Sequence, residues 1–94
     1  MSRQLVHQPE HGRYALLEGG AVVSVLDYAL REDAISFTHT FTNPRHRGRG
    51  LAAELVAFAV DDVEATSSRR VVPMCWYVAQ WFEAHPERAQ LLSR

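Results

Sequence analysis

Apolar and polar positions divide the chain into a strand-rich first half and a helical second half. Residues 13–18, 21–30 and 35–42 are short stretches rich in aliphatic, β-branched and aromatic residues. Gly19-Gly20 separates the first two stretches, and the polar segment 31–34 separates the second from the third. Two glycines between such stretches favour a β-hairpin. The pattern therefore predicts three consecutive strands.

The third predicted strand alternates regularly and ends at Asn43-Pro44. A period of two places four side chains on one face: Ile35, Phe37, His39 and Phe41. The opposite face receives the three hydroxyl side chains, Ser36, Thr38 and Thr40. Because most of the first set is large and apolar, we expect that face to pack on the core. His39 is expected to lie among these apolar neighbours.

The second half begins with a helical pattern from about residue 49 to residue 65. Its apolar stripe contains Leu51, Leu55, Phe58 and Ala59. Val71 and Val72 then start a short buried strand that is cut at Pro73. Proline cannot donate a hydrogen bond to a sheet ladder, so the strand must lack a neighbour there or leave the sheet.

A second helix is expected over about residues 77–84, and it stops at His85-Pro86. The tail after it is short and polar. The resulting order is β-β-β-α-β-α, which predicts an α+β fold with a small mixed, mostly antiparallel sheet and two helices. A length of 94 residues suits a single domain over 1–94.

Charge and cysteine content limit the possible partners and locations. The net charge of −1 argues against a nucleic-acid or membrane-surface binder, which needs a broad basic face. No apolar stretch reaches the length of a membrane span, and the N-terminus lacks the apolar core of a signal peptide. Cys75 is the only cysteine, so a reducing, cytoplasmic setting is expected. The histidines at 7, 11, 46 and 85 lack metal-ligand spacing, and no metal site is expected.

Residues 45–50, read Arg-His-Arg-Gly-Arg-Gly, stand between the third strand and the first helix. The first N–H groups of a helix have no partner within the helix, and the helix dipole favours an anion there. Glycine lets the backbone approach a bulky ligand, and arginines supply charge-assisted donors. The segment therefore predicts a phosphate site, although a tight turn with solvated arginines has the same composition.

Three known motifs could also explain residues 45–50, and the sequence argues against each of them. A P-loop requires lysine, and all ten basic residues of the chain are arginine. Gly48, Gly50 and Ala53 match a dinucleotide fingerprint, but residues 69–73 lack the acidic residue that would bind ribose. An arginine-rich nucleic-acid patch would require interleaved aromatic residues, which are missing.

The pattern R-x-x-G-x-G, here Arg45, Gly48 and Gly50 after a strand, resembles the pyrophosphate loop of the GNAT superfamily of acyl-CoA N-acyltransferases. Flanking motifs extend the resemblance to a branch of minimal, single-domain acetyltransferase-like proteins, over about residues 13–88. These motifs are His39-Thr40, Pro44, Arg47-Gly48-Arg49-Gly50, Val72-Pro73-Met74-Cys75-Trp76-Tyr77-Val78 and His85-Pro86.

The resemblance implies a site for coenzyme A where the third and fourth predicted strands splay apart. The pantetheine arm would pair with the backbone near Phe41 and Thr42. The pyrophosphate would lie on the turn and the first helical residues: Arg45, Arg47, Gly48, Arg49, Gly50, Leu51 and Ala52. Pro73 would remove a ladder donor at the point where the two strands separate.

Cys75 precedes a predicted helix, whose N-terminus would lower the thiol pKa. The resemblance places this cysteine near the coenzyme thiol and makes it a candidate nucleophile, with His39 as its base. Without the resemblance, a small buried hydrophobe is the better interpretation. Two residues depart from the family: Phe82 stands where many members carry a tyrosine acid, and Phe41 where many relatives are acidic.

The function implied is an acetyl-CoA-dependent N-acetyltransferase that acts on an unknown amine. Two alternatives stay open, a module that binds coenzyme A or acetyl-CoA with little turnover and an interaction domain that keeps only the fold. The acceptor is not readable from the chain. Only two glycines join the first two predicted strands, so the acceptor site would be shallow or supplied by a protein partner.

Overall fold

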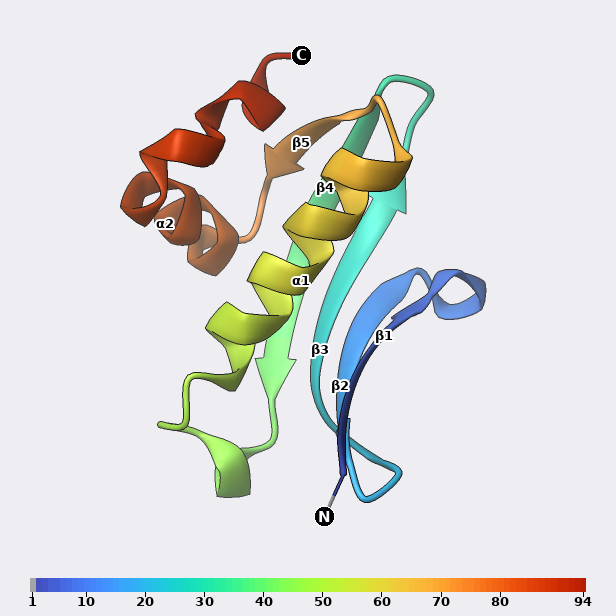
Figure 1. The fold of residues 1–94 in the computed structure, drawn as a ribbon, viewed down its shortest axis with the longest axis vertical. Helices are drawn as coiled ribbons and strands as arrows, with labels where there is room; N and C mark the ends of the chain where they lie inside the picture. Colours follow the sequence, from blue (N-terminus) through green and yellow to red (C-terminus); the bar gives the residue numbers. More distant parts are fainter. Residues whose placement is uncertain (1) are drawn as a thin grey trace.

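A computed structural model describes residues 2–94 and contains one five-stranded sheet in the order β1-β2-β3-β4-β5 (Figure 1). The first four strands pair antiparallel, and β5 pairs parallel to β4. The strands are β1 Arg3–Gln8, β2 Arg13–Glu18, β3 Ala21–Leu30, β4 Ala34–Thr42 and β5 Arg70–Pro73.

Two α-helices, α1 and α2, pack on the same face of this sheet (Figure 1). Helix α1 forms the crossover between the parallel strands β4 and β5, and α2 follows β5 directly. The helical segments are η1 Pro9–His11, η2 Pro44–His46, α1 Leu51–Thr66, α2 Trp76–Ala84 and η3 Pro86–Leu92, where η marks a short 3₁₀ helix. The predicted α+β class with a mixed sheet is confirmed.

The predicted element order lacked the first strand, β1. Only Leu5 and Val6 are apolar in this strand, so its sequence carries no alternation that marks a strand. The strand exists because its backbone pairs with β2 along six residues and because the His7 ring stacks on Tyr14, with ring centroids 4.2 Å apart. The corrected order is β-β-β-β-α-β-α.

The tail also differs from the expected short polar segment. After Pro86 it forms η3, and the side chain of Leu91 is fully buried. A proline at the first helical position is favourable because its missing N–H needs no partner there. Leu91 therefore anchors the tail to the core, although most other residues of the tail are exposed.

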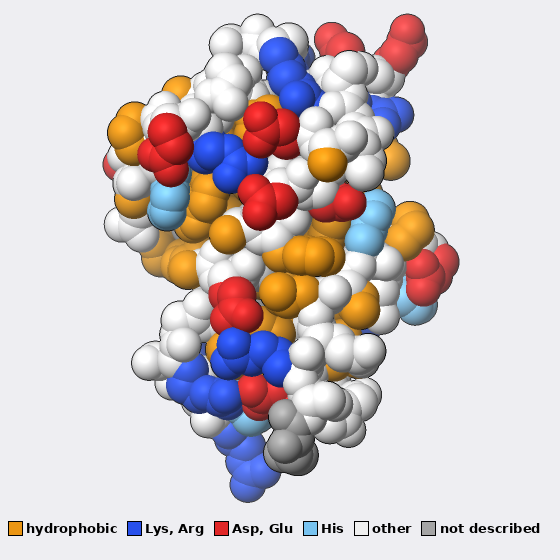
Figure 2. Space-filling view, in the orientation of Figure 1, with side chains coloured by type: hydrophobic (Ala, Val, Ile, Leu, Met, Phe, Trp, Pro, Cys, Tyr) orange, Lys and Arg blue, Asp and Glu red, His pale blue; other side chains and the backbone are white. Residues whose placement is uncertain are grey.

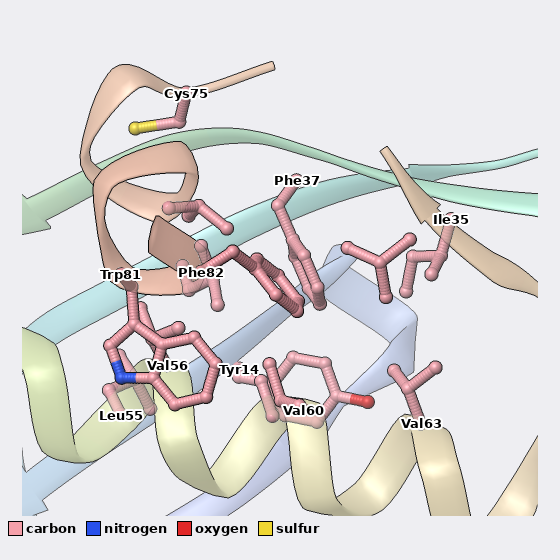
Figure 3. Packing of buried hydrophobic residues seen from close by; sticks show 14 of the residues in the cluster. Tyr14, Ile35, Phe37, Leu55, Val56, Val60, Val63, Cys75, Trp81 and Phe82 are labelled. Atoms are coloured by element: carbon pink, nitrogen blue, oxygen red, sulfur yellow. The ribbon is translucent and has the colours of Figure 1, made fainter. Parts of the chain in front are cut away.

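The core lies between the sheet and the two α-helices. Figure 3 shows Trp81 beside Leu55 and Val56 of α1, and Phe37 and Phe82 side by side above Val60. Burial of these side chains supplies the main stabilisation of a domain of this size. The buried positions of α1 follow the stripe expected for a helix that packs on one side. They are Leu51, Leu55, Val56, Ala59, Val60 and Val63.

A register shift in β4 interrupts the regular alternation of its sequence. Phe37 pairs with Tyr28, yet the next residue of β3, Asp27, pairs with His39. Thr38 is therefore an extra residue, which forms a β-bulge. A bulge of one residue moves every later side chain of the strand to the other face.

The prediction that His39 shares the core-facing side of Phe37 is wrong for this reason. Phe37 is fully buried, whereas His39 is exposed and lies on the opposite face of the sheet together with Phe41. Thr40 takes the core-facing side instead, since it pairs with the buried Leu26. Because of the bulge, Thr40 rather than His39 faces the helices.

The pairing of β4 with β5 ends early, at the pair of Phe37 with Pro73. One more backbone bond follows, in which the Cys75 N–H donates to the Phe37 carbonyl over 2.9 Å. Within residues 2–94, no strand pairs with this edge of β4 beyond that point. Pro73 therefore lies where the two strands separate, as the missing N–H of proline suggested.

Candidate functional site

A pocket with a volume of about 540 Å³ follows the unpaired edge of β4. This volume is in the range of small-molecule and cofactor sites. Four consecutive residues of β4 line it although their side chains alternate between faces, because the pocket runs along the strand edge. The lining residues are His39, Thr40, Phe41, Thr42, His46, Arg47, Gly48, Gly50, Leu51, Ala52, Trp76 and Tyr77.

The glycine-arginine turn forms the wall of the pocket opposite α2. The Asn43 side chain accepts a hydrogen bond from the Arg45 N–H and caps η2. Gly48 and Gly50 then adopt positive φ angles of +82° and +74°. These angles are left-handed, and side chains other than glycine rarely take them. Helix α1 consequently begins at Leu51 rather than at 49, with Gly50 as its N-cap.

The start of α1 points free backbone donors at the pocket. The first intrahelical bond runs from the Glu54 N–H to the Gly50 carbonyl, so the N–H groups of residues 51–53 have no partner within the helix. Leu51 and Ala52, which carry two of these groups, line the pocket. The helix dipole adds partial positive charge at this end. An anionic group is therefore favoured here.

The three arginines of the turn have different surroundings. Arg47 lines the pocket, and its Nε donates to the Thr42 carbonyl over 3.4 Å. Arg45 and Arg49 are absent from the lining. Arg49 instead donates to both carboxylate oxygens of Glu18. The structure thus brings one of the three predicted arginines to the pocket wall.

His46 joins that wall and also contacts the Arg49 guanidinium. Its Nδ1 accepts from Arg49 over 2.7 Å and lies 3.5 Å from Glu18. Figure 2 shows several arginine side chains at the lower end of the molecule, near the turn before α1, with acidic side chains among them. Arg47 and His46 are thus the basic side chains that line the pocket near the start of α1.

Cys75 is the N-cap of α2 and lies at the edge of the core cluster (Figure 3). Its Sγ lies 3.6 Å from Thr40 Oγ1. Burial raises the pKa of the thiol, but hydrogen bonds from the Thr40 side chain and from the N–H groups of Tyr77, Val78 and Thr40 outweigh this and lower the pKa below its ordinary value. The start of α2 therefore favours the thiolate, as the sequence predicted.

Thr40 is the neighbour of Cys75 that the sequence did not reveal. The expected partner of Cys75 was His39, but no hydrogen bond joins His39 to the sulfur within residues 2–94. His39 still lines the 540 Å³ pocket. No sequence signal identifies Thr40, because its place beside Cys75 depends on the bulge at Thr38.

Two aromatic residues of α2 complete the wall. Trp76 and Tyr77 line the pocket, and their rings meet edge to face with centroids 5.9 Å apart. Burial raises the pKa of the Tyr77 phenol, so it stays protonated and can donate a proton or a hydrogen bond. Phe82, at the position where the family places an acid, is buried in the core. Tyr77 is thus the phenol that the structure places at the site.

A family comparison agrees with this geometry. The sequence model of the GCN5-related N-acetyl-transferase family matches residues 13–91, from β2 to η3. The chain belongs to this acetyltransferase family. The matched range contains the whole pocket, both glycines of the turn and Cys75. No protein with a curated description matches the chain.

The family assignment supports acyltransferase chemistry with an acyl-CoA partner. No helix within residues 2–94 combines the length and the apolar character needed to cross a membrane. The same residues contain no group of three or more histidine, cysteine or acidic side chains placed to hold a metal ion.

Proposed function

We propose that the protein binds acetyl-CoA in the 540 Å³ pocket and transfers the acetyl group to an amine. One observation carries this proposal: a single pocket joins the unpaired edge of β4, the N-terminus of α1 and the first residues of α2. The strand edge has backbone groups for the pantetheine amides, and the start of α1 has N–H groups for the pyrophosphate. The start of α2 carries Cys75 for the thioester. The family assignment supplies the class of reaction.

The pantetheine arm would lie along β4 from His39 to Thr42. Beyond Phe37 this strand has no partner on that side within residues 2–94, so its backbone amide groups can pair with the amides of pantetheine. The pyrophosphate would lie on the N–H groups of Leu51 and Ala52 and beside Arg47. A Cβ atom added to Gly48 or Gly50 would meet no heavy atom within 4 Å, so the space beside both glycines is open to a ligand.

Cys75 is the proposed acceptor of the acetyl group in a two-step route. The thiolate attacks the thioester carbonyl carbon, the bond from that carbon to the coenzyme sulfur breaks, and the coenzyme leaves as its thiol with the proton that Cys75 gave up. The amine then attacks the acetyl-cysteine, and the proton lost from nitrogen returns to the Cys75 sulfur. His39 faces away from Cys75 but lines the same pocket, so as the proposed carrier of these protons it would act through solvent in the pocket rather than by direct contact with the sulfur.

A second function is favoured by the burial of the thiol. Cys75 is only 9% exposed, and its contact is the Thr40 hydroxyl rather than an imidazole. A hydroxyl can stabilise a thiolate but does not accept the thiol proton at neutral pH. These facts favour a coenzyme-binding module with little turnover as the alternative.

Calorimetric titration with acetyl-CoA tests the binding step. We expect binding by the wild-type protein and a loss of about 10-fold or more in affinity for Arg47→Gln, because a charge-assisted donor is removed from the pocket wall. Arg45→Gln is the matched control, since Arg45 belongs to the same turn but not to the lining. Its affinity should change by less than about 2-fold. Absence of binding by the wild-type protein would remove the proposal.

Intact-mass analysis separates the enzyme from the binding module. After incubation with acetyl-CoA, an acetyl adduct on Cys75 that disappears when an amine is added supports the two-step route. His39→Ala should slow adduct formation without weakening coenzyme binding by more than a few-fold. If the protein binds acetyl-CoA but forms neither an acetyl-cysteine adduct nor an acetylated amine, the coenzyme-binding module is the better description of its function.

A further inference from the structure

A second pocket lies at the opposite end of α1 from the coenzyme pocket and has a volume of about 170 Å³. The coenzyme pocket uses Leu51 and Ala52, whereas the second pocket uses Asp62 and Thr66. Ten residues of helix correspond to a separation of about 15 Å. The two pockets are therefore separate sites.

Four polar side chains from different elements meet in this second pocket. The Tyr14 hydroxyl donates to Asp62 Oδ2 over 2.7 Å, and His7 Nδ1 lies 3.5 Å from the same oxygen. His7 Nε2 and the Tyr28 hydroxyl are 2.6 Å apart. The network joins β1, β2, β3 and α1, so its members are held in fixed positions before any ligand arrives.

The network leaves one carboxylate oxygen of Asp62, a residue that lines the pocket, without a partner among the described residues. Burial is the main cause that raises the pKa of Tyr14 and of Tyr28, so both phenols remain protonated at neutral pH. Tyr14 and His7 both contact Oδ2 of Asp62. Among the contacts within residues 2–94, the other carboxylate oxygen, Oδ1, has no hydrogen-bond partner. Asp62 can therefore accept a further hydrogen bond from a cation.

Arg69 supplies a positive charge to the same pocket. Its Nε donates to the Arg31 carbonyl over 2.7 Å, which fixes the side chain. Arg69 and Asp62 line one small pocket but form no ion pair within 4.0 Å in the described part of the chain. Opposite charges held apart in one cavity can be bridged by a ligand that carries both.

The remaining wall is aliphatic. Leu30, Ile35 and Val63 line the pocket, and Leu30 is 53% exposed despite its size. An exposed aliphatic side chain beside a small cavity gains from contact with an apolar ligand group. The volume limits that group to a short side chain.

We propose that this second pocket binds a small aliphatic α-amino acid, with its ammonium on Asp62, its carboxylate on Arg69 and its side chain against Leu30, Ile35 and Val63. The proposal does not depend on coenzyme binding. Occupation of the pocket would tie β1 more firmly to the end of α1, because Asp62 already contacts both His7 and Tyr14.

Titration with L-leucine, followed by amide chemical shifts in NMR spectra, tests this site. We expect saturable shifts that cluster around residues 7, 28, 62 and 69. Isopentylamine lacks the carboxylate and 4-methylpentanoate lacks the ammonium, so each should bind about 10-fold more weakly or worse. Isopentylamine binding as tightly as leucine would overturn the zwitterion assignment.

Two variants localise the binding. Asp62→Asn keeps an oxygen for the Tyr14 hydroxyl but removes the charge, and Arg69→Gln changes a side chain outside that network. Each should weaken leucine binding about 10-fold or more, whereas Glu83→Gln, an exposed change on α2, should not alter it. Unchanged affinity in both pocket variants would overturn the proposal, as would the absence of saturable shifts with leucine, valine and alanine. Acetyl-CoA binding by the same samples is measured separately, so failure of this site leaves the coenzyme proposal standing.

Discussion

Glu18 holds the guanidinium of Arg49 with two hydrogen bonds, of 2.6 and 3.1 Å. Glu18 ends β2, and Arg49 belongs to the turn before α1, 31 residues later in the chain. The pair ties the β2–β3 hairpin to the glycine-arginine turn. We therefore expect Arg49 to position the turn, whereas Arg47 lines the pocket.

Replacing Glu18 tests this positioning role. Glu18→Gln should weaken acetyl-CoA binding about 2- to 5-fold, because the turn loses an exposed bidentate anchor rather than a phosphate ligand. The loss should be larger at low salt than at high salt, since exposed ion pairs are screened. Calorimetry at two salt concentrations measures it. A loss as large as that of Arg47→Gln would contradict the assignment of Arg49 as a positioning residue.

The stabilisation that the Glu18–Arg49 pair gives the folded chain should decrease as the pH falls. The hydrogen bond from Arg49 is the first cause that lowers the pKa of Glu18 below its ordinary value of 4.5. A depressed carboxyl pKa stabilises the folded chain above the unfolded pKa, and this contribution is lost as pH falls through the folded value. Thermal unfolding of wild type and Glu18→Gln should therefore differ at pH 7 and converge under acidic conditions below pH 4.5.

Replacing Thr40 tests the environment of the Cys75 thiol. Thr40→Val keeps the shape of the side chain but removes the hydroxyl that lies 3.6 Å from the sulfur. Since this hydrogen bond lowers the thiol pKa, the midpoint of the alkylation rate against pH should move upward in the variant. Iodoacetamide kinetics across pH 6 to 10 measure the midpoint (range chosen to bracket the usual thiol pKa of about 8.5). An unchanged midpoint would assign the low pKa to the α2 backbone donors alone.

Replacing Gly50 tests whether the left-handed backbone of the turn is required for coenzyme binding. Gly50→Ala places a side chain at a φ angle of +74° with no heavy atom within 4 Å, so any cost is conformational rather than steric. We expect a loss of about 1 kcal/mol in stability and weaker acetyl-CoA binding. Gly20→Ala is the matched control, because Gly20 has a φ angle of +83° but lies outside the pocket.

The two glycine variants should thus lose similar stability but differ in coenzyme affinity. The unfolding temperature should fall by about 4–8 °C in both, as expected for about 1 kcal/mol in a domain of this size. Only Gly50→Ala should bind acetyl-CoA more weakly. Equal affinities would show that the positive φ angle serves the fold and not the pocket.

The buried hydroxyl of Tyr14 tests the network at the far end of α1. Tyr14 is 1% exposed, and Tyr14→Phe keeps its ring while removing the donor to Asp62. One lost hydrogen bond of this kind should cost about 1 kcal/mol. Urea unfolding measures the change, and Tyr28→Phe, whose ring is less buried, should cost no more. A neutral Tyr14→Phe would show that Asp62 is satisfied by His7 alone.

Several elements were predictable because their signals are local. The hairpin β2–β3 follows from two glycines between apolar stretches, and α1 follows from a stripe of period 3.6. Pro73 indicated the separation of β4 from β5, because a missing N–H ends a ladder wherever the residue lies. The free donors at the start of α1 were predictable for a similar reason, since the first N–H groups of a helix lack partners within the helix in any fold.

Strand β1 and the burial of Leu91 in the tail were not predictable from local patterns. In β1 the apolar residues are adjacent rather than alternating, and the strand forms because β2 offers a complete backbone edge to pair with. In η3, Leu91 is buried because the fold brings the end of the chain against the core. Both outcomes depend on partners that are distant in sequence.

The sequence by itself determined the α+β class, the order of the later elements, the turn with its free helix donors and the cysteine at the start of a helix. Only the tertiary structure decided which side chains meet. The bulge at Thr38 turned Thr40, and not His39, toward Cys75, and the pair with Glu18 drew Arg49 away from the pocket wall. A side-chain period of two or 3.6 is set by bonds within a segment, whereas strand register and ion pairs are set by the free energy of contacts between segments.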